Sequence, residues 1–383
     1  MDAKNNLGFK GVDHVTFWVG NAKQAASYYN CRFGFQNLAF SGLTTGNRKY
    51  ATHVVRLKQV TLCFTSPTTI DDEDHAEHMK LHGDAIKDIA FKVDDSRLIY
   101  QNAIINGAKS VLEPTELTDK DGTVIMSTIA TPISNITYTF VERKNYTGEF
   151  LPGYSYDVIH DVLSDILEPI EIADIDHFVY CVYENKVEET SEWFYKTLGF
   201  HRYWSADDSI IHTENSGLNS IVVADENSSV KFPINEPVNS VKAKSQTQEF
   251  VDFHGGPGCQ HFAINTINII QTVETLKKRG VVFIPTPKHY YSFLKKRLEN
   301  CPVVVKEEIE TLEKYGIFLD YDDEGYLLQI FTKNVQDKPT FIIEFIQKVG
   351  HIFGFGYGNF KSIFEAIELE QTLRGNLDRN EDK

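Results

Sequence analysis

The chain has 383 residues, 42% of them hydrophobic, and its 38 basic and 54 acidic side chains give a formal net charge of −16. This length and apolar content are typical of a globular protein of two or three domains, and they exclude a disordered, collagen-like or small disulfide-rich chain. The negative charge argues against nucleic acid as a partner, because most of the surface would repel phosphate.

Cysteine usage and hydropathy favour an intracellular protein that is not embedded in a membrane. The five cysteines are odd in number and contain no Cys-x-x-Cys pair, which predicts reduced thiols and a cytoplasmic location. No apolar run approaches the roughly 20 residues that span a bilayer, and the first residues lack the apolar core of a signal peptide. We therefore expect no membrane partner.

In chain order, the first elements form two cycles of a strand followed by a helix. Residues 12–19 predict a strand, and the helix after them closes near Gly34. Residues 84–91 predict a second strand, whose helix closes at Gly107, and residues 139–142 predict a later strand. Residues 146–173, with two Pro-containing turns, predict a connector.

The second half repeats this order. The repeat pairs residues 12–19 with 175–182, 84–91 with 257–264, and 139–142 with 341–344. A helix is predicted from about Lys186 to Thr197, closing at Gly199. The spacing between paired segments grows along the chain, which indicates insertions in the second copy, the largest being a helical stretch over about 289–315.

These elements predict an α+β fold of two tandem halves. We expect an N-terminal scaffold over residues 1–160 and a catalytic half over 161–350. Residues 351–383 would supply a loop, a helix capped by Asn359 and a disordered tail over the last dozen residues. Phe360, Ile363, Phe364 and Ile367 would give that helix one apolar face.

Three equivalent positions of the repeat carry side chains that can bind a metal ion. They hold His14, Asp88 and Glu142 in the first half, and His177, His261 and Glu344 in the second. Residues 341–346 contain no Lys or Arg, and a buried, unpaired Glu344 carboxylate would cost on the order of several kcal/mol. Two His and one carboxylate are the ligand set of non-haem Fe(II) oxygenases. The sequence therefore predicts a metal ion on the second trio and a first-half site that lost its metal.

Taken singly, each of these residues has a plainer interpretation, since a His in a strand is more often a hydrogen-bonded core residue. Other candidates favour structural roles. The three histidines His75, His78 and His82 lie in a strongly polar segment that predicts a solvated surface helix. The glycine-rich residues 354–358 follow no strand-to-helix phosphate pattern and predict a loop over a site.

Several motifs, in order, resemble the vicinal-oxygen-chelate fold and, within it, the 4-hydroxyphenylpyruvate dioxygenase family. They are PINEP at 233–237, KSQTQ at 244–248, GCQH at 258–261, GYLLQIFTK at 325–333, GNF at 358–360 and LRGNL at 373–377. The resemblance covers about residues 8–377. It implies a curved, half-open barrel of βαβββ-type modules in each half and a C-terminal lid helix.

The resemblance also implies a set of site residues. The iron ligands would be His177, His261 and Glu344. The residues that hold the reacting substrate would be Ser220, Asn235, Gln246, Gln260 and Gln329, and the substrate-binding wall would include Pro233, Phe331, Asn359, Phe360 and Phe364. In an ideal strand Gln260 and His261 face opposite ways, so we expect a bend at residues 255–258. Ile342 stands where some relatives carry Phe.

The implied reaction uses one Fe(II) per chain and O2 to convert 4-hydroxyphenylpyruvate, an aromatic 2-oxo acid, into homogentisate and CO2 in tyrosine and phenylalanine catabolism. No 2-oxoglutarate is expected, because the substrate brings its own 2-oxo acid. Members of the resembling family form homodimers or homotetramers, which implies the same for this chain. The alternatives are benzylic hydroxylation of the same substrate, as in hydroxymandelate synthase, extradiol ring cleavage, and a non-catalytic small-molecule-binding protein. Phe331 with Phe360 favours ring hydroxylation, and a buried Glu344 favours an enzyme.

Overall fold

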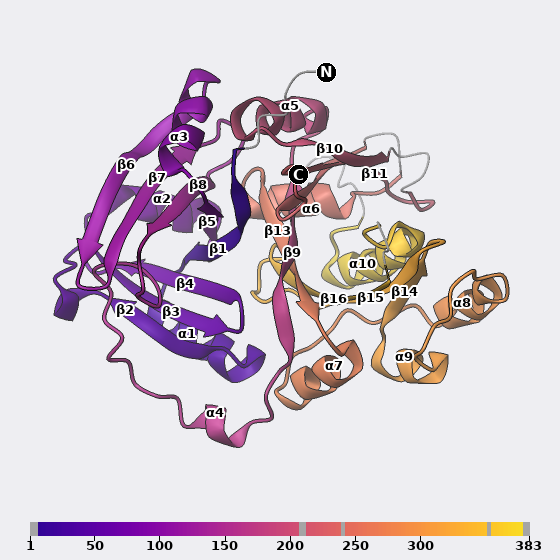
Figure 1. Cartoon of the computed structure of the whole chain (residues 1–383). Coiled ribbons are helices and arrows are strands. Elements are labelled where there is room, and N and C mark those ends of the chain that lie inside the picture. Colours follow the sequence, from indigo (N-terminus) through magenta and orange to yellow (C-terminus); the bar gives the residue numbers. More distant parts are fainter. Residues whose placement is uncertain (1–6, 207–211, 239–241, 351–353, 378–383) are drawn as a thin grey trace.

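The computed structural model describes residues 7–206, 212–238, 242–350 and 354–377. Within them the strands form two eight-stranded sheets, which lie side by side as two curled layers (Figure 1). A long connector that carries the short helix α4 (Leu163–Ile166) joins the two layers. The predicted α+β fold of two tandem half-barrels is confirmed.

The first sheet has the strand order β2-β3-β4-β1-β5-β8-β7-β6. Its elements are β1 (Phe9–Trp18), α1 (Ala22–Phe33), β2 (Gln36–Ser41), η1 (Leu43–Thr45), β3 (Tyr50–Leu57), β4 (Val60–Pro67), α2 (Glu73–Leu81), β5 (Ala85–Val93), α3 (Ser96–Ile105), β6 (Lys109–Asp119), β7 (Gly122–Ala130) and β8 (Thr137–Lys144).

The second sheet has the corresponding order β10-β11-β12-β9-β13-β16-β15-β14. Its elements are β9 (Ile172–Cys181), α5 (Val187–Leu198), β10 (His201–Ala206), β11 (Leu218–Ala224), β12 (Lys231–Pro237), α6 (Gln246–His254), β13 (Gly258–Thr266), α7 (Ile269–Lys278), α8 (Tyr290–Leu298), α9 (Ile309–Tyr315), β14 (Phe318–Tyr321), β15 (Gly325–Phe331), β16 (Ile342–Gly350), η2 (Tyr357–Asn359) and α10 (Phe360–Arg374). Helix α5 closes at Gly199 in the left-handed conformation, as predicted, and the predicted insertion supplies α8 and α9.

The strand register corrects the third pair of the internal repeat. On β13, the residue opposite His177 is also the residue opposite Glu344. On β5, the residue opposite His14 is likewise opposite Thr139, and not Glu142. Thr139 is therefore the structural equivalent of Glu344. The prediction of Glu142 was wrong because it matched the two strands by a shared Glu, and sequence similarity alone does not fix the register of a strand.

The two sheets share one hydrophobic core. The Phe17 ring of the first half lies 5.3 Å from the Phe341 ring of the second, and Phe9 lies 5.2 Å from Phe200. On β9, Phe178 belongs to this core, whereas His177 faces away from it into the concave side of the second sheet. The core thus backs the strands that carry the predicted site.

The histidines of α2 are buried, which corrects the prediction of a solvated helix. His75, His78 and His82 are 4%, 1% and 4% exposed. The rings of His75 and His78 pack on Trp18, and His82 stacks on His254 of α6 at 4.3 Å. The local sequence is polar, but α2 is covered by both halves, which a single segment does not reveal.

The C-terminal segment is more ordered than predicted. Helix α10 extends to Arg374, the Asn376 side chain donates to Glu249 at 3.1 Å, and the Lys244 N–H donates to the Leu377 carbonyl. The predicted tail is therefore wrong for residues 372–377, and its remainder, 378–383, lies outside the described residues. Asn359 stands at the N-cap position, as predicted, but its side chain makes no capping hydrogen bond.

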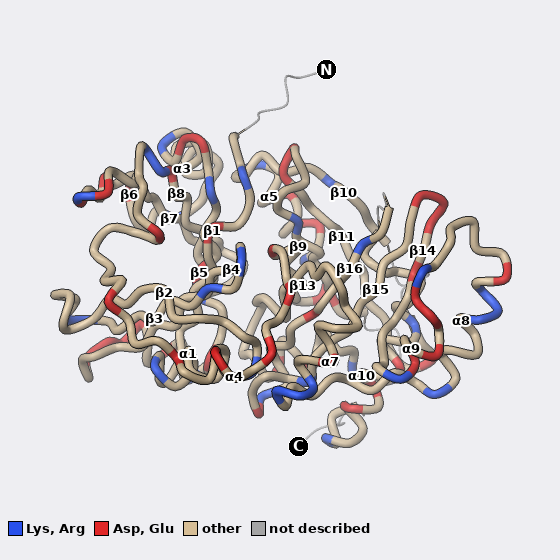
Figure 2. The backbone as a smooth tube through the Cα atoms, turned by 60° about the horizontal axis from the view of Figure 1, so that its bottom comes forward, with Lys and Arg blue, Asp and Glu red and all other residues tan. Residues whose placement is uncertain are grey.

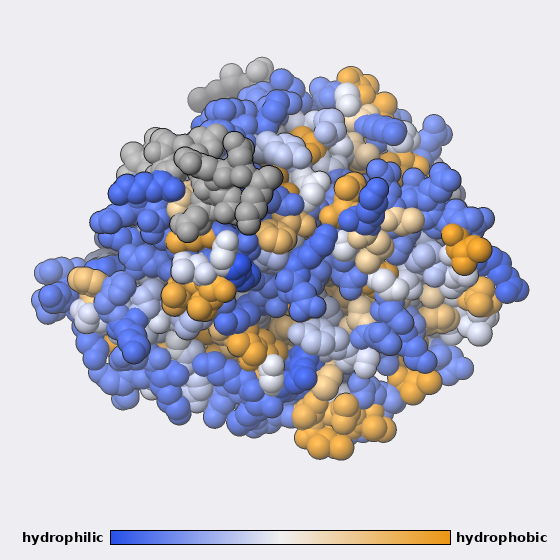
Figure 3. All heavy atoms as spheres, turned by 180° about the vertical axis from the view of Figure 1, so that it is seen from behind, coloured by the Kyte–Doolittle hydropathy of each residue, from blue (hydrophilic) through white to orange (hydrophobic). Residues whose placement is uncertain are grey.

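Acidic and basic residues are interspersed over both halves (Figure 2), and the acidic residues are in excess, 54 against 38. An exposed apolar group stands out at the connector, where Ile159, Val162 and Ile166 are 85%, 66% and 76% exposed, near the lower edge of Figure 3. Among the helices of the described residues, none is long and apolar enough to cross a membrane.

Candidate metal centre

Three adjacent strands bring His177, His261 and Glu344 together. They lie on β9, β13 and β16, which are neighbours in the second sheet. The Nε2 atoms of His177 and His261 lie 3.2 and 3.4 Å from Oε2 of Glu344, and one ligand atom from each residue lies within 4.8 Å of the other two. All three residues are buried, and the described part of the chain holds no other such group.

The trio fits a metal ion. Oε1 of Glu344 is buried and has no hydrogen-bond partner among the described residues, although a carboxylate oxygen in such surroundings needs a donor or a cation. Both imidazoles turn a ring nitrogen toward the same carboxylate. Two neutral imidazoles and one carboxylate, gathered on one side, match the donor set of non-haem Fe(II) sites.

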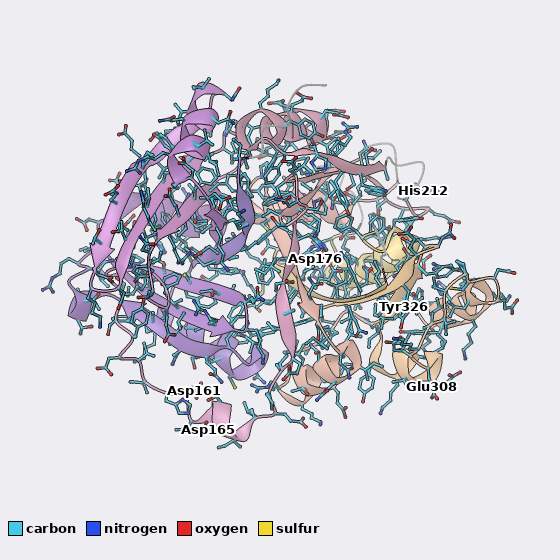
Figure 4. The ribbon with its side chains drawn as sticks, in the orientation of Figure 1. Asp161, Asp165, Asp176, His212, Glu308 and Tyr326 are labelled. Carbon is cyan, nitrogen blue, oxygen red and sulfur yellow. The ribbon has the colours of Figure 1, made fainter. Side chains whose placement is uncertain are left out.

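A second set of polar groups orients the two imidazoles. Nδ1 of His177 lies 2.8 Å from Oδ2 of Asp176, which is labelled near the centre of Figure 4. Lys348 donates to both Asp176 oxygens, at 2.9 and 3.0 Å, so this buried carboxylate is neutralised. Nδ1 of His261 lies 3.2 Å from Oε1 of Gln260. Such outer partners fix the ring tautomer and leave Nε2 free to bind a metal.

The protonation states of Glu344 and His261 agree with metal binding. Burial alone would raise the pKa of the Glu344 carboxyl, but hydrogen bonds and charge from His177 and His261 together bring this pKa below its usual value. Burial lowers the pKa of His261. For His177, burial is outweighed by hydrogen bonds to Asp176 and Glu344, which raise its pKa. An ionised Glu344 and a neutral His261 are the forms that bind metal.

A β-bulge turns Gln260 and His261 to the same side. The register of β13 against β9 skips one residue between Cys259 and His261, and that residue is Gln260. An extra residue in one strand re-aims the side chains beside it. Both side chains consequently line one cavity. The expected bend at residues 255–258 is replaced by this bulge within the strand.

One cavity lies against the trio and is closed on one side by α10. The predicted residues that line it are Ser220, Pro233, Asn235, Gln246, Gln260, Gln329, Phe331, Ile342, Phe360 and Phe364. Ile363 and Ile367, from the predicted apolar face of α10, also line it, and the lining residues that sequence reasoning missed are Val179, Trp204, Leu218, Val222 and Phe355. No Lys or Arg occurs among these described lining residues, so polar selectivity there comes from amides and one hydroxyl.

The polar groups of the cavity come from separate elements. Ser220 on β11 pairs directly with Asn235 on β12, and Gln246 is the first residue of α6. Gln329 lies on β15, and its buried Oε1 lacks a hydrogen-bond partner within the described chain. A few convergent polar groups in an otherwise apolar cavity are typical of a small-molecule site. The orphaned oxygen of Gln329 offers one acceptor to such a ligand.

Asn359 does not line the cavity, which corrects its prediction as a substrate-binding residue. It is fully buried, and its Oδ1 accepts a hydrogen bond from the Tyr290 hydroxyl at 2.8 Å. Its neighbour Phe360 faces the cavity instead, because the helix begins between the two residues and turns their side chains apart.

The missed Phe355 has a counterpart in the first half. Its ring packs edge-on against His177 at 5.1 Å, and the Phe150 ring packs in the same way against His14 at 5.0 Å. Each Phe follows the strand that comes last in its half in chain order, which is β8 in the first half and β16 in the second. The signal was therefore present in the sequence, in a repeat that extends beyond the final strands, whereas nothing local marks Trp204.

The first-half site lacks a ligand set. Thr139 replaces the carboxylate, and its hydroxyl donates to Asp88 at 2.9 Å, as Thr137 does at 2.6 Å. Both hydroxyls donate to Oδ1 of Asp88, and Asp88 occupies the position that His261 has in the second half. The Phe150 ring covers His14. These contacts support the expectation that this half is a scaffold.

Comparison with known proteins agrees with the geometry. Residues 174–330 match the model of the Glyoxalase/Bleomycin resistance protein/Dioxygenase superfamily. The chain is 54% identical to a 4-hydroxyphenylpyruvate dioxygenase of Dictyostelium discoideum, over 96% of this chain and 100% of that protein. It is 49% identical to a 4-hydroxyphenylpyruvate dioxygenase of Tetrahymena thermophila, over 96% of this chain and 92% of that protein. A solved mutant of 4-hydroxymandelate synthase from Streptomyces coelicolor matches with a TM-score of 0.81 at 27% identity, covering 95% of this chain and 99% of the other.

Proposed function

Because the chain belongs to the 4-hydroxyphenylpyruvate dioxygenase family, we propose that this enzyme converts 4-hydroxyphenylpyruvate and O2 into homogentisate and CO2, with one Fe(II) per chain. The observation that carries the proposal is the buried trio His177, His261 and Glu344 beside a cavity of amides and aromatic walls. A sensor or binding protein would have no need of a buried carboxylate with an unpaired oxygen.

His177, His261 and Glu344 are the residues that would hold the metal. Fe(II) held by these residues would supply the redox chemistry that O2 and a 2-oxo acid substrate require. Asp176 and Gln260 hold the imidazoles of His177 and His261 in place for this role. Because the substrate carries its own 2-oxo acid, no 2-oxoglutarate is required.

The cavity walls orient the substrate ring. Phe331 and Phe360 provide aromatic faces, against which an aromatic substrate packs well. Ser220, Asn235 and Gln246 offer donors and acceptors to its polar ends. The apolar side chains of α10 exclude water, which protects reactive species from side reactions.

The second candidate is benzylic hydroxylation of the same substrate, because a hydroxymandelate synthase shares the fold. That reaction needs the same metal and the same 2-oxo acid, so the trio does not separate the two. Identity to the dioxygenases is twice that to the synthase mutant, at 54% against 27%. Ring hydroxylation is therefore the reaction we propose.

We further propose that the enzyme acts in the cytoplasm as a homodimer or homotetramer in tyrosine and phenylalanine catabolism. All five cysteines lie in the described part of the chain and are free thiols, which supports a reducing compartment.

Oxygen uptake by the Fe(II)-loaded protein with 4-hydroxyphenylpyruvate, followed by chromatography of the product, tests the proposed reaction. Homogentisate is expected. Hydroxymandelate would transfer the assignment to the second candidate, and an iron-loaded protein without oxygen uptake would contradict both.

A further inference from the structure

The insertion of the second half and the strand after it carry residues that the site does not explain. Strand β14 lies beside α10, with helix α8 beyond it (Figure 1), and neither β14 nor α8 contributes a side chain to the cavity lining. Yet Asp320 of β14 is only 4% exposed. A buried carboxylate outside the cavity needs a structural reason.

Asp320 and Arg297 together hold the backbone of Gly358 in the turn before α10. The Gly358 N–H donates to Oδ2 of Asp320 at 2.9 Å. Arg297 donates to Oδ1 of the same carboxylate at 2.8 Å and to the Gly358 carbonyl at 3.2 Å. Both polar atoms of Gly358 are thus bound by the two members of one ion pair. A Cβ at this position would collide with the Asp320 carboxylate, so the approach requires glycine.

The insertion holds the next residue as well. The Tyr290 hydroxyl of α8 donates to Oδ1 of the buried Asn359 at 2.8 Å, and it accepts from the Leu319 N–H at 2.7 Å. The turn formed by Gly358 and Asn359 is therefore tied to both α8 and the end of β14. These contacts involve charged or buried groups, which make the stronger hydrogen bonds.

The same turn sets three parts of the cavity. Phe355 and Phe360 stand on either side of it and both line the cavity. Gly356 packs so closely on the side-chain amide of Gln329 that a Cβ there would collide with Oε1. Displacement of the turn would consequently move two aromatic walls and release the amide.

We propose that Asp320, acting with Arg297, is a positioning residue: it clamps the Gly358 backbone and so holds Phe355, Phe360 and Gln329 in the geometry that binds the substrate ring. The inference rests on the proposed function for its kinetic consequence.

The test compares Asp320→Leu, Asp320→Asn and Arg297→Ala with a matched control. Lys295→Ala removes an ion pair of the same helix, to Glu310 at 2.8 Å, in which both side chains are exposed. For each protein, bound Fe(II), kcat and KM for 4-hydroxyphenylpyruvate, and amide hydrogen exchange at residues 354–360 are measured.

Loss of a charged hydrogen-bonding partner should raise KM roughly ten-fold and speed exchange across residues 354–360 to a similar degree in Asp320→Leu and Arg297→Ala. Asp320→Asn keeps one acceptor for Gly358 and should fall between these variants and the wild type. Bound Fe(II) should stay at the wild-type level in all of them, because the trio is untouched, and Lys295→Ala should match the wild type throughout.

The proposal is overturned if Asp320→Leu and Arg297→Ala match Lys295→Ala in both exchange and KM, or if they lose iron together with activity. Should Asp320→Leu fail to fold, Asp320→Asn and Arg297→Ala decide in the same way. The exchange measurement needs no turnover, so a wild-type protein that made no homogentisate would contradict the proposed function and still leave the clamp to be judged.

Discussion

At the residue scale, the chemistry is concentrated in Glu344. Its carboxylate is buried at 2% exposure, its Oε2 lies 3.2 and 3.4 Å from the Nε2 atoms of the two imidazoles, and its Oε1 is unpaired. The sequence predicted this residue from its apolar strand and its place in the repeat. It could not exclude Glu142 as the counterpart, because only the pairing of β5 with β8 shows that Thr139 stands there.

The substrate-binding role of Gln246 is tested against a residue of the same helix. Gln246→Ala should lower kcat/KM by about 10- to 100-fold, since it removes one convergent amide from the cavity, with bound Fe(II) unchanged. Gln248→Ala is the control, because the Gln248 amide donates to Asp252 away from the cavity. Equal kinetics for the two variants would remove Gln246 from the site.

At the scale of elements, the bulge in β13 and the burial of α2 lay beyond sequence reasoning. Alternation predicts strand faces only while the register is regular, and one extra residue at Gln260 breaks it. The polar sequence of α2 describes a solvated helix unless the neighbouring half is known. The order of the repeated segments and the insertion in the second half, by contrast, follow from the spacing between matching segments, and both were predicted.

The buried histidines of α2 and α6 should make the fold sensitive to acid. Burial and nearby positive charge, including Lys87 and Lys338, lower the pKa of His78 to about 2 and that of His254 to about 3. In the unfolded chain both titrate near pH 6.5. The unfolded state therefore binds more protons below that pH, and the free energy of unfolding falls as the pH drops from about 6.5 toward 3.

Each such histidine contributes up to about 1.4 kcal/mol per pH unit to this fall. For each protein, the melting temperature is compared with the value of the same protein at pH 7.5. Between pH 6.5 and 5 the melting temperature of His78→Gln should consequently fall less than that of the wild type. A thermal shift series over this range measures it. Identical pH profiles for the two proteins would show that His78 is not held neutral by the fold.

At the scale of the molecule, two copies of one unit share a core, and among the described residues only the second copy carries a trio that could hold a metal ion. Phe17 packs on both Phe262 and Phe341, and Arg279 of the second half donates to the Cys31 carbonyl of the first at 2.9 Å. The repeat predicted the two halves, but their mutual burial could not be predicted, because it depends on the outer faces of both sheets.

This shared core predicts that the two halves unfold together. Thermal unfolding followed by calorimetry should show one cooperative transition, because separating the halves would expose aromatic side chains of both. Two transitions, or a second half that folds and binds iron when produced alone as residues 161–383, would contradict a single cooperative unit.

The central claim is that His177, His261 and Glu344 hold one catalytic iron. The most direct test measures bound Fe(II) and homogentisate formation together in the wild type and in Glu344→Gln, with circular dichroism as the check on folding. We expect one iron per chain and homogentisate from the wild type. The variant should fold normally, bind iron weakly and form product at least about 100-fold more slowly. A folded Glu344→Gln protein with wild-type turnover would contradict the account.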